Sequence, residues 1–286
     1  MLNIMYGLQT CSSTSPCVQC TLSVSRLKMR DYMAQGDPRT NAMIISDAAA
    51  LDNLRATSKR PKIALAQQKQ YHSVEAAPFT HVQTDHVIVP SVHTFTKMFQ
   101  RTLLKIEEEA DSMELGHELD ARSDSLSITR EAYHGGIFCG NHAHKAVLEQ
   151  NVHKWTAFFP RPWTETIVAL DKMLRALTII SESSRAAMLG GEEQQSLRAA
   201  IHQLCSSWAE RWPDDRLSLK LHALSQHVMP FVEEHGTWGM MQDQGIESLH
   251  PVFNRIHKHH SQCRDDTENL RRIMRHFCIM QMVLLP

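Results

Sequence analysis

The helical spacing of apolar residues is the feature that most constrains how this chain folds. From residue 91 onward, apolar side chains recur every three or four positions, which places them on one face of a helix. Helices are predicted at 141–159, 164–180, 192–212, 215–234 and 265–282, after a first helix that Ser91 caps and Gly116 stops. The sequence therefore predicts a mostly α fold with a helical domain over 91–286. Its expected core positions include Phe95, Met98, Phe99, Leu103, Ile106, Leu170, Met173, Leu174, Leu177, Leu197, Ile201, Leu204 and Trp208.

The first 90 residues are mixed in character. A loop rich in Cys, Ser and Thr runs to Cys20, and Ser46 is expected to cap a short helix over 47–56. Residues 57–90 show little periodicity until the β-branched run at 82–89, which indicates one strand. These features predict a small N-terminal part, 1–90, that is mixed α/β or irregular.

Charge balance and residue counts narrow the class of protein. The 286 residues carry 30 Lys and Arg against 31 Asp and Glu, a balance that argues against a polycationic nucleic-acid binder but leaves room for a local basic face. The longest apolar run, 277–285, is too short to span a bilayer, and residues 1–5 lack the features of a signal peptide. Seven Cys and 18 His indicate a reducing compartment with free thiols, or a metal site.

Cys17 and Cys20 form a C-x-x-C motif on a turn. Two thiolates at this spacing can bind one Zn²⁺, although a redox pair or two incidental thiols fit the motif equally. His222 and His227 are candidates to complete such a site. Five residues on a straight helix separate two side chains by about 140°, so these histidines chelate together only if the helix is distorted. Pro230 would disturb that turn, but spacing alone favours two ordinary, partly buried histidines.

A third segment combines a carboxylate with a basic region. Glu247 precedes Pro251, where a helix is either kinked or begins, so the carboxylate is either a metal ligand or a stabiliser of a helix N-terminus. The residues that follow could contact phosphates or form a solvated helix surface, and charge alone favours the surface. The basic residues are Arg255, Lys258, Arg264, Arg271, Arg272 and Arg275, interleaved with His257, His259, His260 and His276.

Several of these segments, taken in order, resemble one family. The stretch 7–20 with Arg26-Leu27-Lys28, the stretch 220–230, and Gly245-Ile246-Glu247-Ser248 with Phe253, Arg255 and Ser261 are similar to RNase H-like DDE transposases. The similarity is to Transib-type enzymes and to the catalytic subunit of the V(D)J recombinase, and it covers only their C-terminal half. The block 133–145 resembles a Gly-Asn segment of domesticated invertebrate relatives.

The resemblance implies a fold, a zinc site and a lost activity. It implies a helical region held together by structural Zn²⁺ on Cys17, Cys20, His222 and His227, with Glu247 as the last catalytic carboxylate. In an intact relative, Glu247 would bind Mg²⁺ or Mn²⁺ together with two upstream Asp residues, because two metal ions drive the cleavage of a phosphodiester. This chain contains neither Asp, and the nearer one is expected ahead of Met1. The chain as given is therefore expected not to cut DNA.

Partner and location also follow from the resemblance, with alternatives. A fragment or domesticated derivative of such an enzyme is expected in the nucleus, with DNA as its partner. The first alternative is a non-enzymatic helical scaffold that keeps zinc for stability and binds a protein partner or a second copy of itself. The second is a nucleic-acid binder that uses the basic region at 255–276 without catalysis.

Overall fold

The structure is a computed structural model, and it describes most of the chain. The described residues are 5–6, 8–9, 13–24, 27–57, 68–128, 140–240, 250–260, 262, 268, 271–273 and 275–276. The chain forms two compact units, 1–241 and 242–286. Each unit is described by itself.

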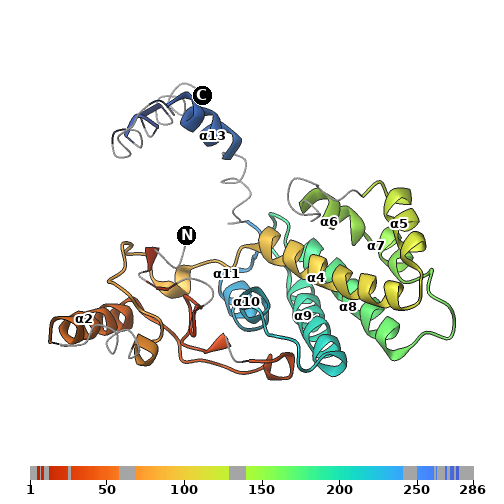
Figure 1. Ribbon diagram of the computed structural model, residues 1–286, viewed down its shortest axis with the longest axis horizontal. Helices are drawn as coiled ribbons and strands as arrows, with labels where there is room; N and C mark the ends of the chain where they lie inside the picture. The colour runs from red at the N-terminus through yellow and green to blue at the C-terminus, as the bar shows by residue number, and fades with distance from the viewer. Residues whose placement is uncertain are drawn as a thin grey trace. The chain divides into compact units, whose positions relative to one another are not determined.

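The first unit is mostly helical (Figure 1). In its described part, strand-like pairing is limited to three isolated bridges: Leu8 with Val74, Cys20 with Pro38, and Lys28 with Arg216. No described helix has the length and apolar character needed to cross a bilayer. The helices are α2 (Asn41–Thr57), α4 (Ser91–Ser112), α5 (Gly116–Ser125), α6 (Gly140–Ala146), α7 (Glu149–Val152), α8 (Glu165–Ser183), α9 (Gly191–Arg211), α10 (Leu219–Gln226) and α11 (Val228–His235).

A large core forms where α8 packs against α9 and α4, which Figure 1 shows side by side. The expected core positions in these three helices are all buried, because their 3.6-residue spacing turns one apolar face toward the neighbouring helices. Thr164 caps α8 by accepting a hydrogen bond from the Ile167 amide at 3.3 Å. The predicted helices at 164–180 and 192–212 are thus confirmed.

A second, smaller core lies in the N-terminal part of the same unit. It joins the inner face of α2 to the short segments around the C-x-x-C motif. Its buried members are Tyr6, Leu8, Val18, Ile44, Ala48 and Val74, with Val87 packed against them. Six buried side chains remove little apolar surface from water, so this core depends on further links to the helical part.

Two predictions for the first 90 residues are wrong. The helix predicted at 47–56 begins earlier, at Asn41, so that Ser46 lies inside it and Thr40 accepts the Met43 amide hydrogen bond at 3.2 Å. No strand forms at 82–89, where the regular structure is the 3₁₀ turn Thr84–His86. The Val82 carbonyl accepts instead from the Tyr6 hydroxyl and the Asn41 side-chain amide, both at 3.0 Å, so side chains replace a strand partner.

The helices predicted at 141–159 and 215–234 are each interrupted. Ser91 is the first residue of α4 and not its cap, because Pro90 holds the cap position, and Gly116 begins α5 instead of ending the first helix. The helix predicted at 141–159 is split into α6, α7 and the 3₁₀ turn His153–Trp155. Side chains farther along the chain satisfy the last carbonyls of α6. Asn151 donates to the Lys145 carbonyl at 2.8 Å, and the Trp155 indole donates to the Ala146 carbonyl at 2.9 Å. These bonds replace those of a continuing helix.

The second unit contains α13 (His250–His259). The helix begins directly before Pro251, in keeping with the tolerance of proline in a first helical turn. Ile256 is buried, whereas Asn254, Arg255 and Lys258 are exposed. The helix predicted at 265–282 lies mostly outside the described residues, although residues 271–273 and 275–276 have helical backbone.

Candidate metal centre

The interruption between α10 and α11 places two histidines of one segment near each other. Ser218 caps α10, and this helix ends at Gln226, so that His227 is the joint between the two helices, with φ −117° and ψ −18°. Pro230 has no N–H to donate to the Gln226 carbonyl, which favours a break at this point. The distortion that the five-residue spacing requires is therefore present, and the 140° separation of a straight helix does not apply.

Four side chains converge on one point. Each of Cys17, Cys20, His222 and His227 offers a ligand atom, and these atoms all lie within 4.8 Å of one another. The Cys17 sulfur lies 3.3 Å from His227 Nε2, the Cys20 sulfur lies 3.2 Å from His222 Nε2, and the two Nε2 atoms are 3.2 Å apart. The two imidazole rings are nearly perpendicular, at 86°.

The donor set fits a tetrahedral zinc ion. With Zn–N of about 2.05 Å and Zn–S of about 2.3 Å, a tetrahedral ion separates two nitrogens by about 3.3 Å and a nitrogen from a sulfur by about 3.6 Å. The distance of 3.2 Å between the two Nε2 atoms agrees with this geometry, and the two S–N distances, 3.3 and 3.2 Å, are shorter than it by about 0.3–0.4 Å. Two thiols and two imidazoles, all contributed by the protein, make a closed structural site and leave no position for a substrate. The cluster can therefore hold a metal such as zinc.

Burial protects the cluster from water. Cys17, Cys20 and His222 are at most 4% exposed, and His227 is half-buried. The hydrogen bond from the Cys20 thiol is the main reason why the pKa of Cys17 falls to about 7, and the same bond raises the pKa of Cys20. Cys17 therefore loses its proton more readily than an ordinary thiol, whereas Cys20 keeps its proton more firmly. A bound cation would displace the proton of Cys20.

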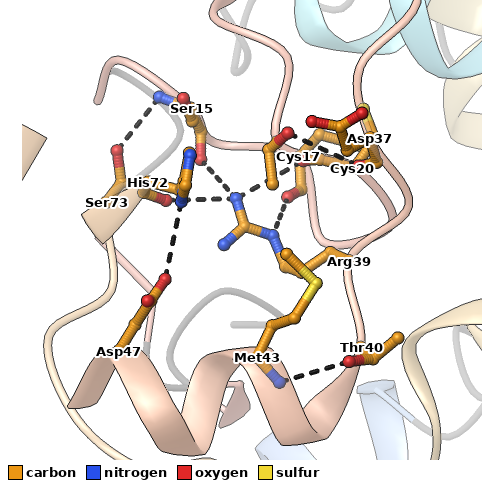
Figure 2. Close-up of polar contacts among 11 residues, drawn as sticks. Ser15, Cys17, Cys20, Asp37, Arg39, Thr40, Met43, Asp47, His72 and Ser73 are labelled. Carbon is orange, nitrogen blue, oxygen red and sulfur yellow. Dashed lines mark hydrogen bonds and ion pairs between the residues drawn. The ribbon is translucent and has the colours of Figure 1, made fainter. Parts of the chain in front are cut away.

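A buried arginine, which the sequence did not indicate, organises the loop around the two cysteines. Arg39 is 3% exposed, and its guanidinium donates to four backbone carbonyls (Figure 2). The acceptors are Ser15 at 3.3 Å, Cys17 at 3.1 Å, Cys20 at 3.4 Å and His72 at 3.1 Å. Arg39 also donates its own amide to the Gln19 carbonyl at 2.9 Å. The motif loop is thereby tied to two other segments through one side chain.

Arg39 also interacts electrostatically with the two cysteines. Desolvation lowers the pKa of Arg39, and the two cysteines act in the opposite direction because a thiolate stabilises a nearby cation. Figure 2 shows Arg39 between the motif loop and the His72–Ser73 turn. His72 contacts Asp47 of α2 at 3.5 Å, so the network continues into the small core. No local spacing in the sequence indicates Arg39, because its acceptors belong to two separate segments, the motif loop and the turn at His72.

The cluster connects the two cores of the first unit. Val18, between the two cysteines, belongs to the small core, whereas Leu221 and Val228, beside the two histidines, belong to the large one. The sequence separations across the cluster are 202 and 210 residues. A metal held here would therefore join segments from opposite ends of the unit.

The other predicted site residues lie in the second unit or outside the described residues. Glu247 and Arg264 lie outside the described residues, as does most of the block 133–145. Five of the predicted basic residues are described and exposed, all in the second unit: Arg255, Lys258, Arg271, Arg272 and Arg275. Arg271 and Arg272 form ion pairs with Glu268 at 4.0 and 3.1 Å.

The sequence matches no protein-family model and no curated protein.

Proposed function

We propose that this chain is the zinc-stabilised C-terminal part, or a domesticated derivative, of a DDE-type DNA transposase or recombinase, and that it does not cleave DNA by itself. The observation that carries the proposal is the convergence of Cys17, Cys20, His222 and His227. These are the four residues that the family resemblance implies as zinc ligands, and two of them are contributed by segments about two hundred residues away from the others.

Zinc has a structural task in this proposal. It binds the C-x-x-C loop to the α10–α11 joint, and Glu247 follows that joint in the sequence. In an intact relative, Glu247 would share Mg²⁺ or Mn²⁺ with two Asp residues that this chain lacks. A single carboxylate does not assemble a two-metal site, so the expected activity is binding without cleavage.

DNA is the proposed partner and the nucleus the proposed location. The exposed basic residues of the second unit support DNA binding, because Lys and Arg at a surface bind phosphates and release counterions. Glu268 offsets part of this charge through its ion pairs with Arg271 and Arg272. Two kinds of variant can therefore test the proposal: one that removes the arginines should weaken DNA binding, and one that removes the Glu268 charge should strengthen it.

The test measures affinity for a labelled duplex of about 30 base pairs between about 50 and 200 mM salt. Replacing Arg271 and Arg272 by Ala should weaken binding and reduce the salt slope by about 1.8, the value for two phosphate contacts. Glu268→Gln should strengthen binding, because it releases both arginines from their ion pairs. The matched control is Arg198→Ala, on α9 of the first unit, which should leave the slope unchanged.

Cleavage is measured in the same samples with added Mg²⁺ or Mn²⁺. The proposal predicts no nicked or joined product. Absence of salt-dependent binding, or a slope that the double Arg variant does not change, would contradict the proposed DNA partner. The non-enzymatic scaffold with a protein partner would then replace it. Strand cleavage by the purified chain would contradict the proposed loss of activity.

A further inference from the structure

Three histidines of the second unit lie side by side, and none of them belongs to the cluster of the first unit. His259 ends α13, His260 follows it directly, and His276 lies sixteen residues farther on in a stretch of helical backbone. The ring centroids are 5.1, 5.5 and 5.8 Å apart, and each pair of rings is nearly perpendicular. Two chain segments thus present three imidazoles to one small region.

Two of the three rings already have the spacing of metal ligands. His260 Nε2 lies 3.2 Å from His276 Nδ1. Two nitrogens on one tetrahedral ion with Zn–N of about 2.05 Å are about 3.3 Å apart. Two ring nitrogens at this distance are in hydrogen-bond contact, and a divalent cation can take the place of the hydrogen between them.

The third ring needs only a side-chain rotation. His259 is exposed, and its ring stands edge-on to both of the others. Among the described residues, the Cys₂His₂ cluster is the one group whose donor atoms all lie within 4.8 Å of one another. The donor atoms of the three histidines are not yet that close together. His259 would therefore change rotamer on binding, which is inexpensive for an exposed side chain.

We propose that His259, His260 and His276 form a second metal site, for a borderline divalent cation such as Zn²⁺, with one coordination position open to solvent. Imidazole suits Zn²⁺, Cu²⁺ and Ni²⁺, whereas Mg²⁺ and Ca²⁺ prefer oxygen ligands. The open position distinguishes this site from the closed Cys₂His₂ cluster, and it is the arrangement in which zinc holds a water molecule.

The electrostatic surroundings set the expected strength of the site. Desolvation, and then electrostatic repulsion by His259, His276 and Arg272, lower the pKa of His260. The same Arg272 repels a divalent cation, although its ion pair with Glu268 offsets part of that repulsion. We therefore expect weaker binding here than at the Cys₂His₂ cluster, which has two thiolates.

The test counts zinc on the untagged full chain, since a polyhistidine tag would itself bind metal. Wild-type protein should hold two equivalents of Zn²⁺, and His260→Gln and His276→Gln should each hold one. The matched control is His257→Gln, an exposed histidine of α13 outside the cluster, which should still hold two equivalents. Circular dichroism of every variant shows whether it is folded.

Co²⁺ separates the two sites by their spectra. The thiolate charge-transfer band reports the Cys₂His₂ cluster, so the second equivalent should add only the weak bands of nitrogen and oxygen ligands. His276→Gln should remove those weak bands and keep the thiolate band. One equivalent on the wild-type protein, or equal occupancy of wild type and His276→Gln, would overturn the second site. Neither result would bear on the first cluster, because the thiolate band reports it separately.

Discussion

Removing zinc from the Cys₂His₂ cluster is predicted to destabilise the N-terminal part of the first unit by about 5 kcal/mol. The magnitude follows from the 202 residues that separate Cys20 from His222. Bringing together two points so far apart in an unfolded chain costs about 5 kcal/mol of chain entropy, and this cost is only about 1 kcal/mol smaller when the large core stays folded and about 70 residues, from Cys20 to the start of α4, are free. The folded chain already holds these residues together, so zinc favours the folded state over the unfolded one by about this amount.

The loss should be local, because the two cores differ in size. The small core has six buried members and depends on the metal, whereas α8 and α9 lie in the large core. A loss of about 5 kcal/mol corresponds to an increase in amide exchange of between about 10³ and 10⁴. This increase is expected in the C-x-x-C loop and in α2, and α8 and α9 should keep their protection.

Hydrogen exchange with mass spectrometry measures both regions in one experiment. The samples are zinc-loaded protein, chelator-treated protein, His222→Gln, and the matched control His202→Gln, which replaces an exposed histidine of α9. His222→Gln should reproduce the effect of the chelator, and His202→Gln should resemble wild type. Equal protection of α2 in all four samples would refute the reasoning. A loss of protection that is as large in α8 as in α2 would refute it as well.

Three further predictions concern single side chains. Arg39→Met should lower the free energy of unfolding by about 3–5 kcal/mol in urea melts, because it leaves four carbonyls without their buried donor. As a control, replacing the exposed Arg55 by Met should change the free energy of unfolding by less than about 0.5 kcal/mol. Burial raises the pKa of Cys205 to about 12, so iodoacetamide at about pH 8 should modify it only after unfolding, as mass spectrometry would show. Desolvation lowers the pKa of His144 in the folded state, so the unfolded state binds a proton at a higher pH than the folded state does. The free energy of unfolding should therefore decrease as the pH drops below about 6.5, and His144→Gln should make that decrease smaller in urea melts at different pH values.

The long helices were predictable because their signal is local and repeated. α8 and α9 have 19 and 21 residues, and every expected core position in their apolar stripes is buried. The Thr164 cap also depends only on neighbours in sequence. Such elements can be predicted from short-range patterns.

The joint at His227 was not predictable from periodicity alone. The end of α10 is held by contacts with a segment nearly two hundred residues away, where Ser225 and Gln226 both donate to the Tyr32 carbonyl, at 3.3 and 2.9 Å. The apolar pattern continues across the joint, so it predicts one helix where the structure has two. Pro230 was the single local signal of a break.

The metal ligands could be predicted in part from the sequence, whereas the arginine that holds the motif loop in place could not. The C-x-x-C motif indicates two ligands by itself, whereas the histidine pair came from the family resemblance. Arg39 belongs to no recognisable motif. Its role as a hydrogen-bond donor becomes visible only in the folded chain, where the carbonyls of Ser15, Cys17 and His72 surround it. A buried cation with backbone partners leaves no pattern in the sequence that spacing rules detect.

The central claim is that Cys17, Cys20, His222 and His227 hold one structural zinc ion. The most direct measurement is the metal content of untagged protein that carries His260→Gln and His276→Gln, since these changes remove the second proposed site. This variant should hold about one zinc per folded chain, and it should lose that zinc when Cys17 and Cys20 are also replaced by Ser. Less than about 0.2 equivalents of zinc in the folded double histidine variant would contradict it, because a closed site of this kind should be full.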